Sequence, residues 1–170
     1  YVKDLCNALE NSAWAKNDPY CLGIFIGNEF EWPDRFSQLV FELPDNDSTK
    51  QWVLSQVRQK YSTMQELNQA WGTSFSSWDQ VLQHGDTAYH ASAAKDIDPL
   101  YFEYAQEFFR KSKQAIERSL PGTLFLGCRC HRGPNVLGRA AVGHADVFSV
   151  NVYDHVVRSW QVPDNADLPV

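Results

Sequence analysis

The chain has 170 residues, of which 44 % are apolar and 21 % are charged, and its formal charge is −6. This length corresponds to about one domain, and the composition excludes a disordered tail. An acidic balance argues against a nucleic-acid partner, and we expect no membrane partner because no apolar run approaches the roughly 18 residues of a membrane helix.

Aromatic residues make up 14 % of the chain, with six tryptophans, seven tyrosines and ten phenylalanines. Two interpretations stay open: the rings fill the core, or some of them line a groove and stack on sugars or bases. Because the net negative charge repels phosphates, the second interpretation favours sugars over nucleic acid.

The first predicted strand covers residues 20–27, after the turn signal Asp18-Pro19. Its nearly continuous apolar run is typical of a strand that is buried on both faces of a parallel sheet. The strand ends at Asn28-Glu29, where polar residues begin. A long segment follows, far longer than the roughly 30 residues of a simple βαβ unit, and we expect it to be mostly helical.

Three helices are predicted in this segment, over about residues 48–61, 63–71 and 99–120. Asp47 supplies an N-cap for the first helix. Thr63 and Glu66 have the spacing of a capping box, and Gly72 is a stop signal for the second helix. Asp98, which is followed by a proline, predicts the cap and start of the third helix.

Further strands are predicted over residues 123–129 and 147–153, with a short helix over about 135–143 between them, and residues 168–170 begin a fourth strand. Strands that alternate with helices indicate a parallel sheet with covered faces. The predicted fold class is therefore α/β, as an open doubly wound sheet or as part of a (β/α)8 barrel.

Polar residues follow the predicted strands at their C-terminal ends, where α/β proteins place their functional residues. The candidate site residues at these ends are Asn28, Glu29, Trp32, Arg129, His131, Asn151 and Tyr153. Together they offer carboxylate, amide, guanidinium, imidazole, phenol and indole groups. Glu31 is the alternative to Glu29 as the functional carboxylate.

Sequence signatures of several other sites are absent. The chain lacks the Gly-x-Gly-x-x-Gly and P-loop motifs of nucleotide-binding proteins, and it lacks the Gly-x-Ser-x-Gly and His-Glu-x-x-His motifs of hydrolases. Cys128, Cys130 and His131 have neither the usual spacing nor the fourth ligand of a structural zinc site. We therefore expect no metal and no cofactor.

Four segments carry a family resemblance: Gly23–Trp32, Tyr61–Trp78, Leu126–Arg129 and Ala145–Tyr153. In this order they resemble the β-agarases and their β-galactosidase-like relatives, which are retaining glycoside hydrolases. The resemblance implies a partial (β/α)8 TIM barrel that covers about strand 4 to the start of strand 7. It also implies that residues 1–170 are part of one catalytic domain, with residues 33–98 as a helical insertion after strand 4.

The resemblance implies roles for the candidate residues. Glu29 is expected to be the general acid/base of a retaining mechanism, which uses two carboxyl groups about 5–5.5 Å apart. Asn28 is expected to bind the sugar 2-hydroxyl, and Tyr153 to lie near the nucleophile. Trp32 either stacks on a sugar or packs in the core. The weaker candidates for sugar hydroxyl partners are Arg129, His131 and Asn151.

The implied nucleophile is a glutamate at the end of strand seven, which we expect beyond Val170. Because a complete barrel typically takes about 250 residues, residues 1–170 alone are expected to have no hydrolase activity. The full-length protein is expected to cleave β-linked galactose-containing polysaccharide, as an agarase does. The alternatives are a β-galactosidase acting on short oligosaccharides, a catalytically inactive carbohydrate-binding barrel, and an unrelated α/β module.

The resemblance also implies a secreted or periplasmic protein, although no signal region opens this chain. The expected partner is an oligosaccharide or polysaccharide substrate. The exact polysaccharide, endo or exo action, and the oligomeric state stay open at the level of sequence.

Overall fold

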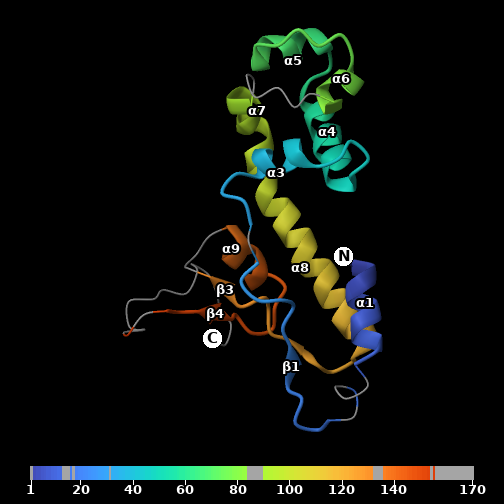
Figure 1. Ribbon diagram of the computed structural model, residues 1–170, viewed down its shortest axis with the longest axis vertical. Coiled ribbons are helices and arrows are strands. Elements are labelled where there is room, and N and C mark those ends of the chain that lie inside the picture. Colours follow the sequence, from blue (N-terminus) through green and yellow to red (C-terminus); the bar gives the residue numbers. More distant parts are fainter. Residues whose placement is uncertain are drawn as a thin grey trace. The chain divides into compact units, whose positions relative to one another are not determined.

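The computed structural model describes residues 2–12, 16, 18–30, 32–83, 90–131, 136–153 and 155. In chain order its elements are α1 (Val2–Glu10), β1 (Gly23–Ile24), α3 (Phe36–Glu42), α4 (Ser48–Lys60), α5 (Met64–Trp71), α6 (Trp78–Gln83), α7 (His90–Ile97), the 3-10 helix η2 (Asp98–Leu100), α8 (Tyr101–Ser119), β2 (Leu124–Phe125), β3 (Cys130–His131), α9 (Val136–Val142) and β4 (Val150–Asn151). The structure is mixed α/β and mostly helical (Figure 1).

The chain divides into two compact units. The strand unit comprises Tyr1–Glu31 and Phe102–Val170, and the helical unit comprises Trp32–Tyr101. Figure 1 shows the strands with α1 and α9 in the first unit and α3 to α7 in the second. The segment predicted as a helical insertion, residues 33–98, lies within the helical unit.

The strand unit contains two pairs of parallel strands. β1 pairs with β2, with Gly23 opposite Leu124, and β3 pairs with β4, with His131 opposite Asn151. The predicted parallel pairing is therefore present in the described residues. The regular strands are much shorter than predicted, with two residues each. The backbone leaves the extended region after β1 and β2, at the positive φ angles of Gly27 and Gly127.

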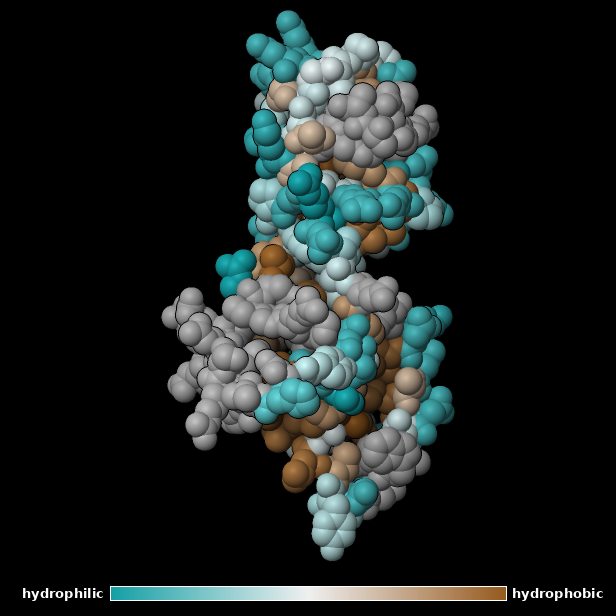
Figure 2. Space-filling view, turned by 60° about the vertical axis from the view of Figure 1, so that its left-hand side comes forward, coloured by the Kyte–Doolittle hydropathy of each residue, from teal (hydrophilic) through white to brown (hydrophobic). Residues whose placement is uncertain are grey.

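The first predicted strand is not buried on both faces. Leu22 is 76 % exposed and Phe25 is 44 % exposed, whereas Ile26 is buried. Hydrophobic residues, in brown, reach the surface of the strand unit in Figure 2. The prediction of two covered faces is wrong for Leu22 and Phe25, because none of the described elements buries these two side chains.

The core of the strand unit lies where α8 and β2 meet. Phe109 of α8 and Phe125 of β2 are both buried, and their ring centroids are 6.3 Å apart. Ala115 and Ile116 continue the buried face of α8, as expected from its helical periodicity. This packing supports β2 and thereby the strand end that follows it.

Local capping signals in the helical unit are confirmed. The Asp47 carboxylate accepts hydrogen bonds from the backbone N–H groups of Thr49 (2.7 Å) and Lys50 (3.4 Å) at the start of α4. Thr63 and Glu66 form a complete capping box at the start of α5. α5 ends at Gly72, which has a φ of 69°, a conformation that favours glycine.

The predicted third helix is present as η2 and α8, but the predicted capping role of Asp98 is wrong. α7, η2 and α8 follow one another directly along the chain, and Asp98 is the first residue of η2 and not a cap before it. Its carboxylate instead accepts a 2.8 Å hydrogen bond from the backbone N–H of Ser37, in the first turn of α3. Asp98 thus caps a helix that lies 61 residues earlier, which a local sequence pattern cannot indicate.

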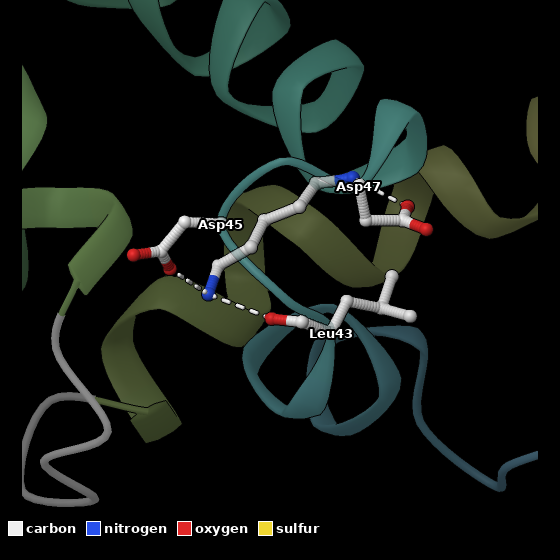
Figure 3. Close-up of polar contacts among 4 residues, drawn as sticks. Leu43, Asp45 and Asp47 are labelled. Carbon is white, nitrogen blue, oxygen red and sulfur yellow. Dashed lines mark hydrogen bonds and ion pairs between the residues drawn. The ribbon is translucent and has the colours of Figure 1, made fainter.

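Lys50 is buried in the helical unit, and its ammonium group is neutralised locally. It donates 3.0 Å and 3.1 Å hydrogen bonds to the carbonyl of Leu43 and the carboxylate of Asp45. Figure 3 shows both bonds, together with the capping contact of Asp47. A buried ammonium requires such partners, so Lys50 links the α3–α4 loop to α4.

The Tyr61–Trp78 segment, which carries part of the family resemblance, has a structural role. The Asp96 carboxylate in α7 accepts hydrogen bonds from the Tyr61 hydroxyl (2.8 Å), the Trp71 indole (2.7 Å) and the Lys60 ammonium. The Asn68 side chain bonds both the N–H and the carbonyl of Phe75, at 2.8 Å and 2.9 Å. These contacts join α4, α5 and α7 and order the loop after α5.

The remaining predicted elements are partly described. α9 (Val136–Val142) matches the predicted short helix, and the predicted fourth strand at residues 168–170 lies outside the described residues. In the part of the chain that the structure describes, no helix is sufficiently long and apolar to cross a membrane.

Candidate active site

The ends of β1 and β2 have the same unusual backbone. Gly27 and Glu29 have φ angles of 67° and 46°, and the corresponding Gly127 and Arg129 have φ angles of 76° and 50°. A Cβ on Gly27 would lie 2.0 Å from the Phe30 ring, and the positive φ of this residue also favours glycine. Non-glycine residues with positive φ are strained, and such strain is concentrated at functional sites.

The backbone of β1 and β2 stays connected at these ends. The Ile26 N–H donates to the Gly127 carbonyl at 2.9 Å, and the Glu29 N–H donates to the Cys128 carbonyl at 3.3 Å. Glu29 is therefore anchored to the neighbouring strand by its own backbone. The backbone hydrogen bonds of Ile26 and Glu29 thus restrict the position of the segment that carries the Glu29 side chain.

The Glu29 carboxylate is the centre of a polar cluster. Its Oε1 atom accepts a 2.5 Å hydrogen bond from the Asn151 side-chain amide and a hydrogen bond from the Tyr153 hydroxyl. The same amide nitrogen lies 3.3 Å from Oδ1 of Asn28. The structure therefore brings together four of the predicted site residues, from strand ends that are more than 120 residues apart in the sequence.

Arg129 joins this cluster through Asn151. Its Nε atom donates to Oδ1 of Asn151 at 3.4 Å, and the centre of its guanidinium group lies 5.7 Å from the Phe25 ring centroid. This is within the range of a cation–π contact. Phe25 was not among the predicted site residues, since an aromatic residue in an apolar strand carries no signal of such a contact.

Tyr153 is 74 % exposed. The hydrogen bond that it donates to Glu29, with a smaller contribution from desolvation, raises the pKa of the phenol above its ordinary value. The phenol therefore keeps its proton at neutral pH and remains a donor to the carboxylate. The cluster therefore consists of the Glu29 carboxyl group, which can give and take a proton, and two neutral hydrogen-bond donors, the Asn151 amide and the Tyr153 hydroxyl.

Two predicted site residues are not assigned to this cluster. Trp32 belongs to the helical unit, where its half-buried ring lies 6.0 Å from the Tyr101 ring. The backbone of His131 is in β3, but its side chain lies outside the described part of the structure. Within the described residues, no group of three histidine, cysteine or acidic side chains is arranged to hold a metal.

Asp146 supports the site and was missed at the level of sequence. Its carboxylate accepts hydrogen bonds from the Lys113 ammonium (2.7 Å) and the backbone N–H of Phe125 (2.9 Å). Burial raises the pKa of this carboxyl, but the two hydrogen bonds outweigh burial and leave the pKa below its ordinary value. The Asp146 N–H also donates to the Phe125 carbonyl at 2.9 Å, so Asp146 connects α8, β2 and the segment before β4.

The sequence and structure of the chain are similar to those of known glycoside hydrolases. The glycoside hydrolase family 42, described as β-galactosidase, matches residues 1–164 of the chain. The chain belongs to this family. The strand-end cluster around Glu29 lies within the matched residues.

Relatives of this family-42 chain include agarases. Beta-agarase A of Vibrio sp. (strain JT0107) is 32 % identical over 157 residues, which are 81 % of this chain and 16 % of that protein. The solved structure of the agarase AgWH50C has a TM-score of 0.75 and 28 % identity, over 89 % of this chain and 24 % of that chain. A solved exo-beta-agarase has a TM-score of 0.74 and 28 % identity, over 90 % of this chain and 22 % of that chain.

The family-42 chain thus spans about a sixth of the length of the curated agarase and about a quarter of the two solved agarases. These likenesses extend over most of the chain. They agree with the resemblance found in the sequence.

Proposed function

We propose that the full-length protein is a glycoside hydrolase that cleaves β-linked galactose-containing polysaccharide by a retaining double-displacement mechanism. The observation that carries this proposal is the Glu29 carboxylate at a strand end, held by Asn151 and Tyr153 beside Asn28. Membership of family 42 supports the reaction class, and the likeness to agarases supports the substrate class.

The proposed architecture is a partial (β/α)8 barrel from about strand 4 to the start of strand 7. β1 corresponds to strand 4, β2 and β3 to strand 5, and β4 to strand 6, with residues 33–98 as an insertion after strand 4. Parallel pairing of β1 with β2 and of β3 with β4 supports this order. Residues 1–170 are then part of one catalytic domain.

In the first step of the proposed mechanism, Glu29 donates its proton to the leaving glycosidic oxygen. The nucleophile, a glutamate that we expect beyond Val170, attacks the anomeric carbon and forms the glycosyl-enzyme. The Glu29 carboxylate that results is stabilised by the hydrogen bonds from Asn151 and Tyr153. In the second step Glu29 removes a proton from water, which displaces the nucleophile and releases the sugar.

Other residues are proposed to bind the substrate. Asn28 is next to Glu29 in sequence and in space, so its amide is the proposed partner of the sugar 2-hydroxyl. Trp32 as a stacking platform and His131 as a hydroxyl partner remain predictions. A polymeric substrate is also consistent with a secreted or periplasmic protein, which cell fractionation would test.

A β-galactosidase acting on short oligosaccharides is the second candidate, and the description of the matched family favours it. The two candidates differ in the length of sugar chain that they require. Comparing kcat/KM for agarose oligomers with kcat/KM for a small aryl galactoside separates them. We expect the agarose oligomers to be the better substrates.

The role of Glu29 is tested by the substitution Glu29→Gln in the full-length protein. Removing a general acid typically lowers the rate about 10²–10⁴-fold, so we expect a loss of this size in kcat on an unactivated oligosaccharide. Binding of the same oligosaccharide, measured by calorimetry, is expected to persist because glutamine has the same shape as glutamate.

Glu31→Gln is the matched control for this experiment, because Glu31 is the alternative carboxylate in the sequence. We expect it to keep most of the activity. Loss of activity in Glu31→Gln, with full activity in Glu29→Gln, would reverse the assignment. Sugar binding by a wild-type protein that hydrolyses none of the tested glycosides would instead indicate an inactive carbohydrate-binding barrel.

A further inference from the structure

We propose that Arg129 is a positioning residue for Glu29, which acts by fixing the orientation of the Asn151 side-chain amide. This inference rests on the proposed function, because it assigns Glu29 the acid/base role. It also gives Arg129 a different task from the sugar contact expected at the level of sequence.

The amide of Asn151 has one accepting and one donating end, and the two ends are nearly equal in size. Its Oδ1 atom faces Nε of Arg129 at 3.4 Å. Its Nδ2 atom faces Oε1 of Glu29 at 2.5 Å and Oδ1 of Asn28 at 3.3 Å. Every one of these contacts would be lost or made repulsive if the amide rotated by half a turn.

Arginine is well suited to set this orientation because a guanidinium group only donates hydrogen bonds. A donor beside Asn151 forces Oδ1 toward itself and leaves Nδ2 for the carboxylate. An amide N–H on Glu29 favours the ionised carboxylate, whereas an amide oxygen there would favour the protonated carboxyl. Arg129 therefore controls which protonation state of Glu29 the cluster prefers.

The position of the Arg129 guanidinium group is restricted by a contact with Phe25 and by the backbone conformation of Arg129. The Phe25 ring lies 5.7 Å from its centre, and the backbone of Arg129 has a φ of 50°. Glycine is favoured at such an angle, so the strained arginine is retained at the cost of local stability. This strain is the observation that separates Arg129 from an ordinary surface arginine.

Arg129 and Tyr153 are two charged or titratable side chains that the structure describes near the Glu29 carboxylate. Tyr153 donates to Glu29 directly, whereas the contact of Arg129 passes through Asn151. A direct effect of the arginine charge and an effect transmitted by the amide can therefore be separated by removing Asn151.

The test measures the titration of Glu29 in the full-length protein by carbon-13 NMR of glutamate labelled at the side-chain carboxyl. The Glu29 signal is assigned by its loss in Glu29→Gln. We expect Arg129→Gln to raise the titration midpoint by about half a pH unit or more. In the Asn151→Ala background, the same substitution is expected to shift the midpoint by less than about a third of that amount.

Two further variants make the test decisive. Arg129→Gly removes the guanidinium and relieves the positive φ, so it folds even if Arg129→Gln does not, and it is expected to give the same shift. Arg139→Gln is the matched control, because Arg139 also lies over an aromatic ring, that of Phe102 at 5.6 Å. We expect no change in the Glu29 midpoint for Arg139→Gln.

Enzyme activity supplies an independent readout. Because Glu29 must be protonated to act as an acid, the alkaline limb of the kcat/KM profile is expected to move upward with the NMR midpoint in Arg129→Gln. No shift of the midpoint, or an equal shift with and without Asn151, would overturn the proposal. A wild-type protein without hydrolase activity would refute the proposed function alone, since the NMR titration does not depend on turnover.

Discussion

Among the described residues, Glu29 and Arg129 are the non-glycine residues with positive φ angles. Both occupy the second position after a glycine that also has positive φ, at the ends of paired strands. The sequence around each contains a glycine but gives no sign that the following polar residue shares its conformation. Strain at these two residues places a carboxylate and a guanidinium at the same edge of the sheet.

This strain predicts an unusual order of stability for substitutions of Glu29. Glu29→Gly is expected to be more stable than Glu29→Ala by about 1 kcal/mol, because an L-residue in the left-handed region is disfavoured by roughly this amount. Both substitutions delete the same hydrogen bonds, so the comparison isolates the backbone. Urea denaturation of the full-length protein measures the difference.

Gln51, which is exposed in α4, provides the control for this comparison. There the order is expected to reverse, with alanine more stable than glycine by about 1 kcal/mol. An alanine variant at Glu29 that equals or exceeds the glycine variant in stability would argue against strain at this position.

At the scale of elements, Asp96 joins three helices of the helical unit. Its side chain is 6 % exposed, and it accepts hydrogen bonds from Lys60, Tyr61 and Trp71. Burial raises the pKa of Asp96, but these hydrogen bonds have the larger combined effect and lower the pKa below its ordinary value. The ionised carboxylate is therefore the form that stabilises the helical unit.

We predict that Asp96→Asn lowers the free energy of unfolding by about 2 kcal/mol at pH 7, the typical value of hydrogen bonds to a charged group. A lowered pKa in the folded state stabilises the protein above the pKa of the unfolded state, about 3.9. This contribution is lost as the pH falls through the folded-state pKa of Asp96. The difference between wild type and variant is thus expected to shrink below about pH 4.

Thermal unfolding at several pH values, followed by circular dichroism, measures this difference. Asp34→Asn is the matched control, because Asp34 is an exposed aspartate of the same unit, and we expect it to change stability by less than about 0.5 kcal/mol. A constant gap between wild type and Asp96→Asn from pH 7 to pH 3 would contradict the assigned role of the carboxylate.

At the scale of the whole molecule, the helical unit begins and ends with aromatic residues that contact each other. Tyr101 stacks on Phe36, with ring centroids 5.2 Å apart, and its hydroxyl donates to the Pro33 carbonyl at 3.1 Å. Trp32 lies 6.0 Å from the same tyrosine ring. The two points where the chain enters and leaves the unit are thereby joined within it.

We predict that residues 32–101, produced as a separate polypeptide, fold cooperatively. The reason is that these residues form a compact unit with its own buried core, and that the aromatic contacts of Tyr101 are made to residues of the same unit. Residues 33–98 are the matched control, since this shorter segment lacks Trp32 and Tyr101. Losing a buried aromatic side chain typically costs about 3–5 kcal/mol, so we expect the shorter segment to be largely unfolded at 25 °C. Circular dichroism during urea titration distinguishes the two, and equal stability would refute the role of Tyr101.

Features that depend on residues close together in the chain could be predicted from the amino-acid sequence alone. The Asp47 cap, the Thr63–Glu66 capping box and the stop at Gly72 are all present as predicted. In the first two signals a side chain bonds a backbone group two or three residues away, within reach whatever the rest of the fold does. Gly72 ends α5 because glycine adopts the left-handed conformation without a steric cost. Glu29 and its neighbours are predicted as candidate site residues from their place at predicted strand ends.

Which of these residues contact one another depends on the three-dimensional fold and could not be predicted from local sequence. Asp98 has a strong local capping pattern, yet its carboxylate bonds the distant Ser37. Asn151 bonds Glu29 across 122 residues, because parallel pairing brings the ends of separate strands to one edge. The energy of such a contact depends on the register of strands and the packing of helices, and neither is encoded in the few residues on either side of it.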